Sequence, residues 1–204
     1  MKLLKKLTQG FTMIELLIVI AVLGILAVAV LAAINPIEQI NRGKDTGSRS
    51  DAEQLSSAMD RFYASKGYYP WTTGASDTNT STYGAGVAAM TKLNSSTVGV
   101  GGDTPLQQPL QNLSVGGTSE LKASFITRIA DPAYNFLSLY NDGTSGHSTY
   151  VCFVPKSSSF RDEAWKRCTG TLPADFPASA CPVGATCTTA ATADAATGCY
   201  ICLP

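Results

Sequence analysis

Residues 5–20 read KKLTQGFTMIELLIVI, and this stretch decides how the rest of the chain is organised. It joins a basic leader, which also contains Lys2, to an apolar run that carries a single charge, Glu15. From Leu16 to Ile34 there are 19 residues without a charge. As a helix, residues 11–34 would extend about 36 Å at about 1.5 Å per residue, enough to cross a hydrocarbon core of about 30 Å. We therefore predict a transmembrane or filament-core helix at residues 11–34.

Glu15 is the residue that this apolar segment has to accommodate. An ionised carboxylate at the centre of a spanning helix costs on the order of 2.5–3.5 kcal/mol on insertion scales, so Glu15 requires a partner. The leader lysines indicate a cytoplasmic amino terminus, with everything after Pro36 outside. We expect a single-pass precursor in the cytoplasmic (inner) membrane.

The string Gly10-Phe11-Thr12-Met13-Ile14-Glu15-Leu16 resembles the cleavage and methylation signature of bacterial type IV prepilins and type II secretion pseudopilins. The resemblance implies that a prepilin peptidase cuts between Gly10 and Phe11, removes residues 1–10 as a leader peptide, and methylates the new amino-terminal Phe11. It also implies that Glu15 faces the amino terminus of a neighbouring subunit in a helical filament. Desolvation cancels much of the attraction between such buried charges, so we expect the pair to set the register of assembly.

Two simpler interpretations share part of this pattern. A secretory signal peptide would also have a basic start and an apolar core, with cleavage near Ala29 or Ala32. A plain signal anchor would leave Glu15 as an accident near the membrane interface. The signal peptide explains neither Glu15 nor the length of the apolar run, so the prepilin-type interpretation is preferred.

The apolar pattern after residue 34 changes to the three- and four-residue spacing of an amphipathic helix. Asn35-Pro36 should bend or briefly break the helix, because proline lacks the amide donor and crowds the preceding turn. Residues 35–66 should form the amphipathic second half, which Gly67-Tyr68-Tyr69-Pro70 should end. We expect residues 67–204 to form an extracytoplasmic globular head.

The head is expected to contain a small antiparallel sheet, which gives the chain an α+β fold. Strands at 136–140 and 148–154, joined by a turn-forming loop, should form the centre of this sheet within a strand region at 133–155. A Gly-, Ser- and Thr-rich variable loop at 72–119 reads as a surface connection with short helical turns such as 86–93. Glycosylation is left open at three Asn-x-Ser/Thr triplets, which begin at Asn79, Asn94 and Asn112.

Two further helices are expected in the head. One covers residues 120–129, with Thr118 or Ser119 as its cap and Asp131-Pro132 as its end. The other covers residues 159–167, with Ser159 as its cap.

All six cysteines lie in the last 53 residues. An even number in the part that the lysines place outside the membrane predicts two or three disulfides formed in an oxidising compartment. Six cysteines allow 15 pairings, and the sequence does not choose among them. The Cys-rich tail at 168–204 has little apolar content, so disulfides should decide its order. The cysteines are Cys152, Cys168, Cys181, Cys187, Cys199 and Cys202.

Several other chemistries are disfavoured. Cys199 and Cys202 have the CxxC spacing of thiol oxidoreductases and zinc sites, but no helix follows them to lower a thiol pKa, and the sole histidine, His147, lies in the loop between the expected strands. No nucleophile elbow or phosphate-binding loop is present in the sequence, so we expect no enzymatic activity and no cofactor. Calcium at Asp131 and Asp142, with Asp103, is a minor alternative, as the major pseudopilins hold calcium in their sheet region.

Charge argues against a nucleic-acid partner. The formal net charge of the 204 residues is zero, and removal of the three leader lysines leaves 12 basic and 15 acidic residues. The chain therefore has no excess of basic residues that would indicate a nucleic-acid partner.

The length of the chain leaves room for one spanning helix and one modest domain.

The sequence thus predicts a pilin, a structural subunit of a type IV pilus-like extracellular filament. Its partners would be copies of itself, a prepilin peptidase and an assembly platform in the membrane. A type II secretion pseudopilin, a membrane-anchored enzyme or thiol oxidoreductase, and a disulfide-rich binding protein or adhesin remain alternatives. Lateral packing in the filament core would involve Leu16, Leu17, Ile18, Ile20, Leu23, Ile25 and Leu26.

Overall fold

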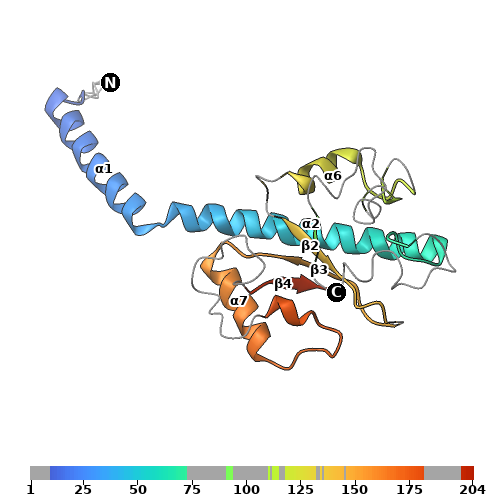
Figure 1. Ribbon diagram of the computed structural model, residues 1–204. Coiled ribbons are helices and arrows are strands. Elements are labelled where there is room, and N and C mark those ends of the chain that lie inside the picture. The colour runs from blue at the N-terminus through green and yellow to red at the C-terminus, as the bar shows by residue number, and fades with distance from the viewer. Residues whose placement is uncertain are drawn as a thin grey trace, which may run out of the picture. The chain divides into compact units, whose positions relative to one another are not determined.

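The computed structural model of the chain describes residues 10–72, 91–93, 110, 112–114, 118–131, 134, 136–144, 146–181 and 199–204. The chain divides into two compact units, residues 1–39 and residues 40–204. The first unit contains helix α1 (Met13–Ala33), and the second is the head. Helix α2 (Pro36–Lys66) begins in the first unit and continues as the longest element of the head (Figure 1).

The break between α1 and α2 lies where the sequence predicts it. Ile34 and Asn35 are not helical, and the amide of Glu38 donates to Asn35 Oδ1 at 3.3 Å. Pro36 occupies the first position of α2, where its missing amide costs no helical hydrogen bond. The predicted interruption at Asn35-Pro36 is therefore confirmed, with Asn35 acting as a cap for the second helix.

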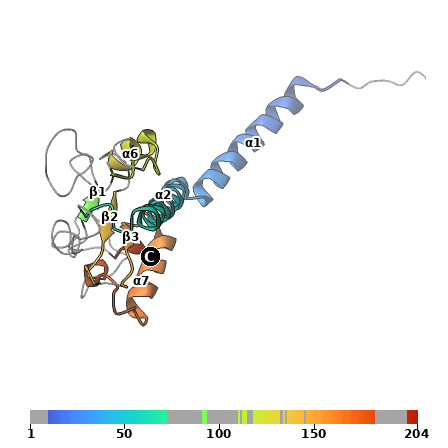
Figure 2. The ribbon, with the colours of Figure 1, turned by 90° about the vertical axis from the view of Figure 1, so that its right-hand side faces the viewer.

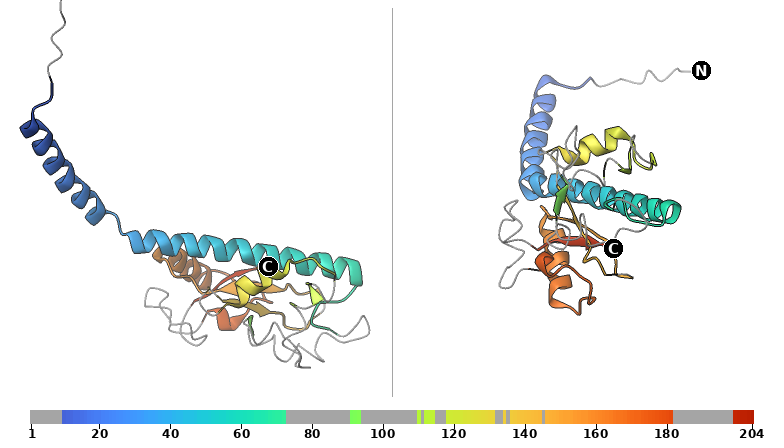
Figure 3. Two further views of the ribbon diagram at one scale, coloured as in Figure 1. Left: turned by 90° about the horizontal axis from the view of Figure 1, so that it is seen from above. Right: turned by 45° about the vertical axis from the view of Figure 1, so that its right-hand side comes forward.

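Helix α2 buries one face against the rest of the head, and in the left panel of Figure 3 it runs along one side of the head. Its end is as expected, because Gly67 adopts a positive φ of 75° and its amide donates to the carbonyl of Tyr63 at 2.7 Å. The buried face mixes apolar and polar side chains: Asp45, Ser48, Asp51, Ala52, Leu55, Ser56, Ala58, Met59 and Phe62.

The sheet is antiparallel with the strand order β1-β2-β3-β4. Its central strands are β2 (Leu137–Tyr140) and β3 (Tyr150–Phe153), so the predicted hairpin and the α+β fold are confirmed. The edge strands β1 (Thr91–Leu93) and β4 (Ile201–Leu203) were not expected. The expected helical turn at 86–93 is wrong for its last three residues, which pair with β2, and residues 86–90 lie outside the described residues.

The two faces of the sheet contact different parts of the chain. Alternate strand residues such as Leu139 and Val151 share one core with the apolar side chains of α2 and with α6 (Ala123–Ala130). Side chains on the opposite face of the sheet form a second cluster, here called the outer cluster. Residues of segment 172–181 cover the strands on this face. The outer cluster comprises Tyr150, Cys152, Phe176, Ala180, Tyr200 and Cys202.

Two helices of the head begin at residues other than those expected. Helix α6 starts three residues late, and neither Thr118 nor Ser119 caps it, since Lys122 occupies the cap position without a side-chain bond. Ser119 instead adopts a positive φ of 57°. The expected end at Asp131 is confirmed.

Helix α7 (Ser158–Thr169) is capped by Ser157 rather than by Ser159, because buried Asp45 accepts hydrogen bonds from both the amide and the hydroxyl of Ser157, each at 2.7 Å. This anchor fixes Ser157 outside the helix, and its hydroxyl then accepts the amide of Phe160. Helices α6 and α7 lie on opposite sides of α2 (Figures 1 and 2).

Disulfides cross-link the carboxy-terminal part of the head. Cys152 and Cys202 are register partners on β3 and β4 and form one disulfide. The second joins Cys168 near the end of α7 to Cys181, just after the short 3-10 helix η1 (Ala178–Ala180). Cys199 is also disulfide-bonded, and Cys187 lies outside the described residues. The prediction of two or three disulfides is confirmed.

Two glycines of α2 should respond differently to alanine. A Cβ on Gly43 would meet no atom within 4 Å, whereas a Cβ on Gly47 would lie 3.3 Å from the hydroxyl of Tyr134, which Asp51 holds in place. Gly43→Ala should stabilise the head by about 0.5–1 kcal/mol, and Gly47→Ala should fall short of that gain. Urea unfolding of the full chain in detergent measures both, and an equal gain in the two variants would contradict the close packing at Gly47.

Candidate processing and assembly site

The start of α1 is held by two residues, Thr12 and Glu15, that bond to each other's backbone. Thr12 Oγ1 accepts the amide of Glu15 at 3.3 Å, and Glu15 Oε2 accepts the amide of Thr12 at 2.9 Å. The Thr12 hydroxyl also donates to the same carboxylate oxygen at 2.7 Å. This is a capping box, in which each side chain satisfies an amide that the helix cannot.

The capping box gives Glu15 a partner that the sequence prediction did not include. Glu15 was expected to require a charge from a neighbouring subunit, yet its own helix start already supplies donors. The signal was present in the sequence, because a threonine followed three residues later by a glutamate, just before an apolar run, is typical of this cap.

Gly10 and Phe11 lie directly before the cap, outside the helix. Both are exposed, and 81% of Phe11 is accessible. A Cβ placed on Gly10 would meet no atom within 4 Å. The fold of this chain therefore does not require glycine at position 10. The absence of a side chain at this position can instead matter for recognition by another protein.

Helix α1 is long and apolar enough to cross a membrane. It has 21 residues with a mean hydropathy of 3.2, and none of its residues is buried within the described part of the chain. At about 1.5 Å per residue it spans about 32 Å, against a hydrocarbon core of about 30 Å. An apolar surface of this extent requires cover by lipid or by other helices.

Comparison with protein families finds one match at this site. The model described as the prokaryotic N-terminal methylation motif matches residues 5–31. The chain carries the type IV pilin and pseudopilin signature. The matched residues include the second half of the leader up to Gly10, then Phe11, the capping box and most of α1. Comparisons with curated proteins and with solved structures give no significant match.

The prepilin-type signature carries general consequences. It implies processing by a prepilin peptidase and assembly into a filament. Together with α1 it fits a membrane-anchored precursor that is later assembled outside the cell. The chain therefore fits a type IV pilin or a pseudopilin.

In the head, buried acids on α2 attach the flanking helices. Asp45 is fully buried and also accepts the amide of Lys156, at 2.9 Å. Asp51, which is 3% exposed, pairs with Arg128 of α6 and accepts the hydroxyl of Tyr134 at 3.0 Å. Burial, and then the bond to Asp51, raise the pKa of Tyr134. Both acids have partners within the head. Asp45 holds the start of α7 against α2, and Asp51 holds α6 against α2.

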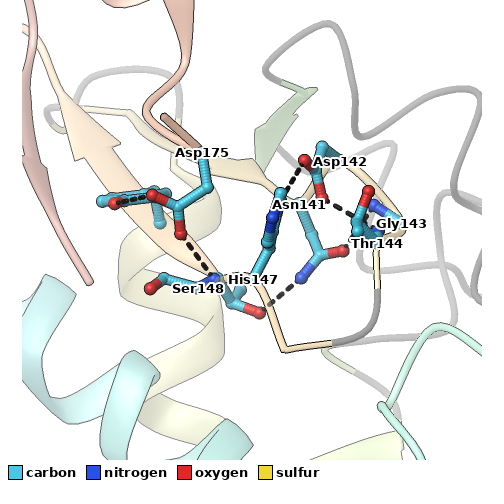
Figure 4. A network of polar contacts seen from close by, with 9 residues as sticks. Asn141, Asp142, Gly143, Thr144, His147, Ser148 and Asp175 are labelled. Atoms are coloured by element: carbon cyan, nitrogen blue, oxygen red, sulfur yellow. Dashed lines mark hydrogen bonds and ion pairs between the residues drawn. The ribbon is translucent and has the colours of Figure 1, made fainter. Parts of the chain in front are cut away.

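A second polar network lies in the loop between β2 and β3 (Figure 4). His147 Nδ1 lies 2.5 Å from Asp142 Oδ2, and the amide of Thr144 donates to the other oxygen of Asp142 at 2.9 Å. Burial raises the pKa of Asp142, but the hydrogen bonds from the Thr144 amide and the His147 ring together lower this pKa by more. The pKa of Asp142 therefore lies below its ordinary value. His147 lies in the loop between the two central strands, as expected, and it is partly exposed and paired with Asp142.

Asp175 fastens segment 172–181 to this loop. One carboxylate oxygen of Asp175 accepts the amide of Ser148 at 2.8 Å (Figure 4). The other accepts the hydroxyl of Tyr150 at 3.0 Å. The Ser148 amide lowers the pKa of Asp175 more than burial raises it. Burial, and then the bond to Asp175, raise the pKa of Tyr150.

The candidate metal and thiol sites are not assembled in the described residues. Asp131 ends α6, whereas Asp142 lies in the β2–β3 loop, and Asp103 lies outside the described residues. Within the described ranges, no group of three or more His, Cys, Asp or Glu residues could hold a metal ion. Cys202 pairs with Cys152 and not with Cys199, so the CxxC spacing does not form a disulfide of its own.

Of the three glycosylation triplets, only Asn112 lies in the described residues. Its side-chain amide donates to the carbonyl of Pro70 at 2.7 Å. A glycan on that nitrogen would have to displace this bond.

The hydrogen bonds to Asp175 should make the head sensitive to acid. Because the folded-state pKa of Asp175 is lowered, its contribution to stability is present above its unfolded pKa of about 3.9 and is lost as pH falls through the folded value. Between about pH 6 and about pH 3, Asp175→Asn should therefore lose less unfolding free energy than the wild type.

Urea unfolding of the full chain at each pH measures this loss. Asn141→Ala is the control, because it alters the same loop without changing a titrating group, and its loss should parallel that of the wild type. Parallel curves for Asp175→Asn and the wild type would show that Asp175 does not contribute to the acid response.

Proposed function

We propose that this chain is a pilin, a structural subunit of a type IV pilus-like extracellular filament. The observation that carries the proposal is the capped start of α1: a processing motif, a lone acid and an uncovered apolar helix follow one another without a gap. The processing motif needs a peptidase, and the uncovered helix needs lipid or other helices around it. In a filament of identical chains, the helices of neighbouring subunits supply that cover.

The proposed order of events begins with membrane insertion. The leader lysines hold the amino terminus in the cytoplasm, and α1 crosses the inner membrane. The peptidase then cuts between Gly10 and Phe11 and methylates Phe11. The capping box keeps the Glu15 carboxylate at the start of the helix throughout, close to the amine that cleavage creates.

Assembly transfers α1 from lipid to a bundle of other α1 helices. Lipid tails are as apolar as leucine, so this transfer has little hydrophobic driving force of its own, and close packing and polar contacts decide the arrangement. In the proposed filament, Glu15 meets the freed amine of a neighbouring Phe11. Only one register brings this pair together, so the charge selects that register.

The head is proposed to have a structural role, without a catalytic site or a cofactor. Disulfides cross-link β4 and segment 172–181 to the body of the head, which suits a protein exposed outside the cell. Some pilins close a carboxy-terminal loop with a disulfide, and the Cys168–Cys181 bond supports the pilin over the pseudopilin. A pseudopilin would share α1 and its signature but build a short periplasmic pseudopilus.

Glu15→Gln separates the charge of Glu15 from its capping role. Glutamine retains an oxygen that can accept the Thr12 amide, so the precursor should insert and be cleaved normally. Without the charge, the neighbouring amine is left unpaired in the filament core, and the amount of filament should fall by at least roughly tenfold.

The measurement compares sheared surface filaments with membrane-bound protein, in cells that contain the complete assembly machinery. Glu53→Gln is the matched control, because Glu53 is an exposed acid of α2 whose loss should leave assembly unchanged. Wild-type quantities of filament from Glu15→Gln would remove the register argument. Absence of filaments from the unaltered chain would overturn the proposed function itself.

A further inference from the structure

We propose that Thr12 is a positioning residue for the processing reaction. Its capping box fixes the first residue of α1 at Met13 and so keeps the peptide bond between Gly10 and Phe11 in non-helical chain, where the peptidase can reach it. This inference rests on the proposed function, because it assumes that cleavage occurs at that bond.

The geometry around Thr12 shows where the helix stops. Thr12 has φ −79° and ψ 151°, an extended conformation, and Met13 is the first helical residue. The amide of Leu16 donates to the carbonyl of Thr12 at 3.2 Å, so Thr12 already accepts a hydrogen bond from the first turn. Gly10 and Phe11 lie beyond this boundary and are exposed.

A helix that extended two residues further would protect the bond. In an α-helix the carbonyl of residue i accepts the amide of residue i+4, so the Gly10 carbonyl would be bonded to the Ile14 amide. The apolar run favours helix, because amides near lipid must be satisfied within the segment. The Thr12 hydroxyl and the Glu15 carboxylate satisfy two of these amides without further helix and so oppose its extension.

The reaction that Thr12 would assist is a hydrolysis. The oxygen of a water molecule bonds to the carbonyl carbon of Gly10, the bond from that carbon to the Phe11 nitrogen breaks, and a proton passes to the nitrogen. Gly10 leaves as a carboxylate and Phe11 gains a free amine. Thr12 takes no part in these bond changes; it sets the fraction of precursor whose Gly10 carbonyl is free to be attacked.

The test uses the full-length precursor in detergent with a purified prepilin peptidase. Thr12→Val keeps the shape of the side chain but removes the hydroxyl, and Thr12→Ser restores the hydroxyl without the methyl group. Loss of the cap should lower the competent fraction, so Thr12→Val should raise KM roughly fivefold while kcat stays unchanged. Thr12→Ser should be cleaved with the KM of the wild type.

A structural readout accompanies the kinetics. With isotope-labelled precursor, the carbonyl carbon shifts of Gly10 and Phe11 should report extended chain in the wild type and in Thr12→Ser. In Thr12→Val they should move toward helical values. Unchanged KM and unchanged shifts in Thr12→Val would overturn the inference, as would a Thr12→Ser precursor that behaves like Thr12→Val.

The outcomes also separate this inference from the proposed function. Gly10→Val is the negative control and should remain uncut, since a Cβ at this position meets no atom within 4 Å in the described residues and the change should act on recognition. If the wild type is not cut between Gly10 and Phe11, the proposed function fails. If the wild type is cut there and Thr12→Val is cut with equal KM, only the role of Thr12 fails.

Discussion

The bonds between Glu15 and Thr12 make the rest of the arrangement physically acceptable. A carboxylate beside an apolar helix needs donors, and the amide and hydroxyl of Thr12 provide them within the chain itself. The acid can therefore exist in the membrane before any neighbour arrives. The same bonds mark where the helix begins, which leaves Gly10 and Phe11 in accessible chain and keeps the carboxylate beside the place where a new amine would form.

Buried acids with local donors also organise the head. Asp45 binds two backbone amides and a hydroxyl at the start of α7, and Asp51 binds Arg128 and Tyr134 next to α6. Both acids belong to α2, so one helix presents anchoring points to the elements on its two sides. Because each carboxylate is held by several donors, its burial does not leave an unpaired charge. α6 and the start of α7 are thereby attached to α2.

The sequence predicted the features that depend on local chemistry. The apolar run of α1, the break at Asn35-Pro36, the end of α2 at Gly67 and the central hairpin all follow from side-chain pattern and turn residues close by in the chain. Glu15 was singled out for the cost of burying its charge, but the Thr12 cap was overlooked.

The features that escaped prediction depend on distant residues. Ser157 became the cap of α7 because Asp45, more than a hundred residues earlier, holds it. β4 forms where Cys202 meets Cys152, and β1 forms only by pairing with β2. Three-residue strands and disulfide partners carry no periodic signal, so their positions follow from the assembled fold alone.

The central claim is that cleavage in front of Phe11 converts a membrane-anchored precursor into a polymer subunit. Intact-mass and fragmentation analysis of the chain recovered from the cell surface tests it most directly. The account predicts a polypeptide that lacks residues 1–10, begins with Phe11 and carries one methyl group on its terminal nitrogen. A surface form that begins elsewhere, for example after Ala29 or Ala32, would contradict it, because α1 would then lack both its cap and its assembly partner.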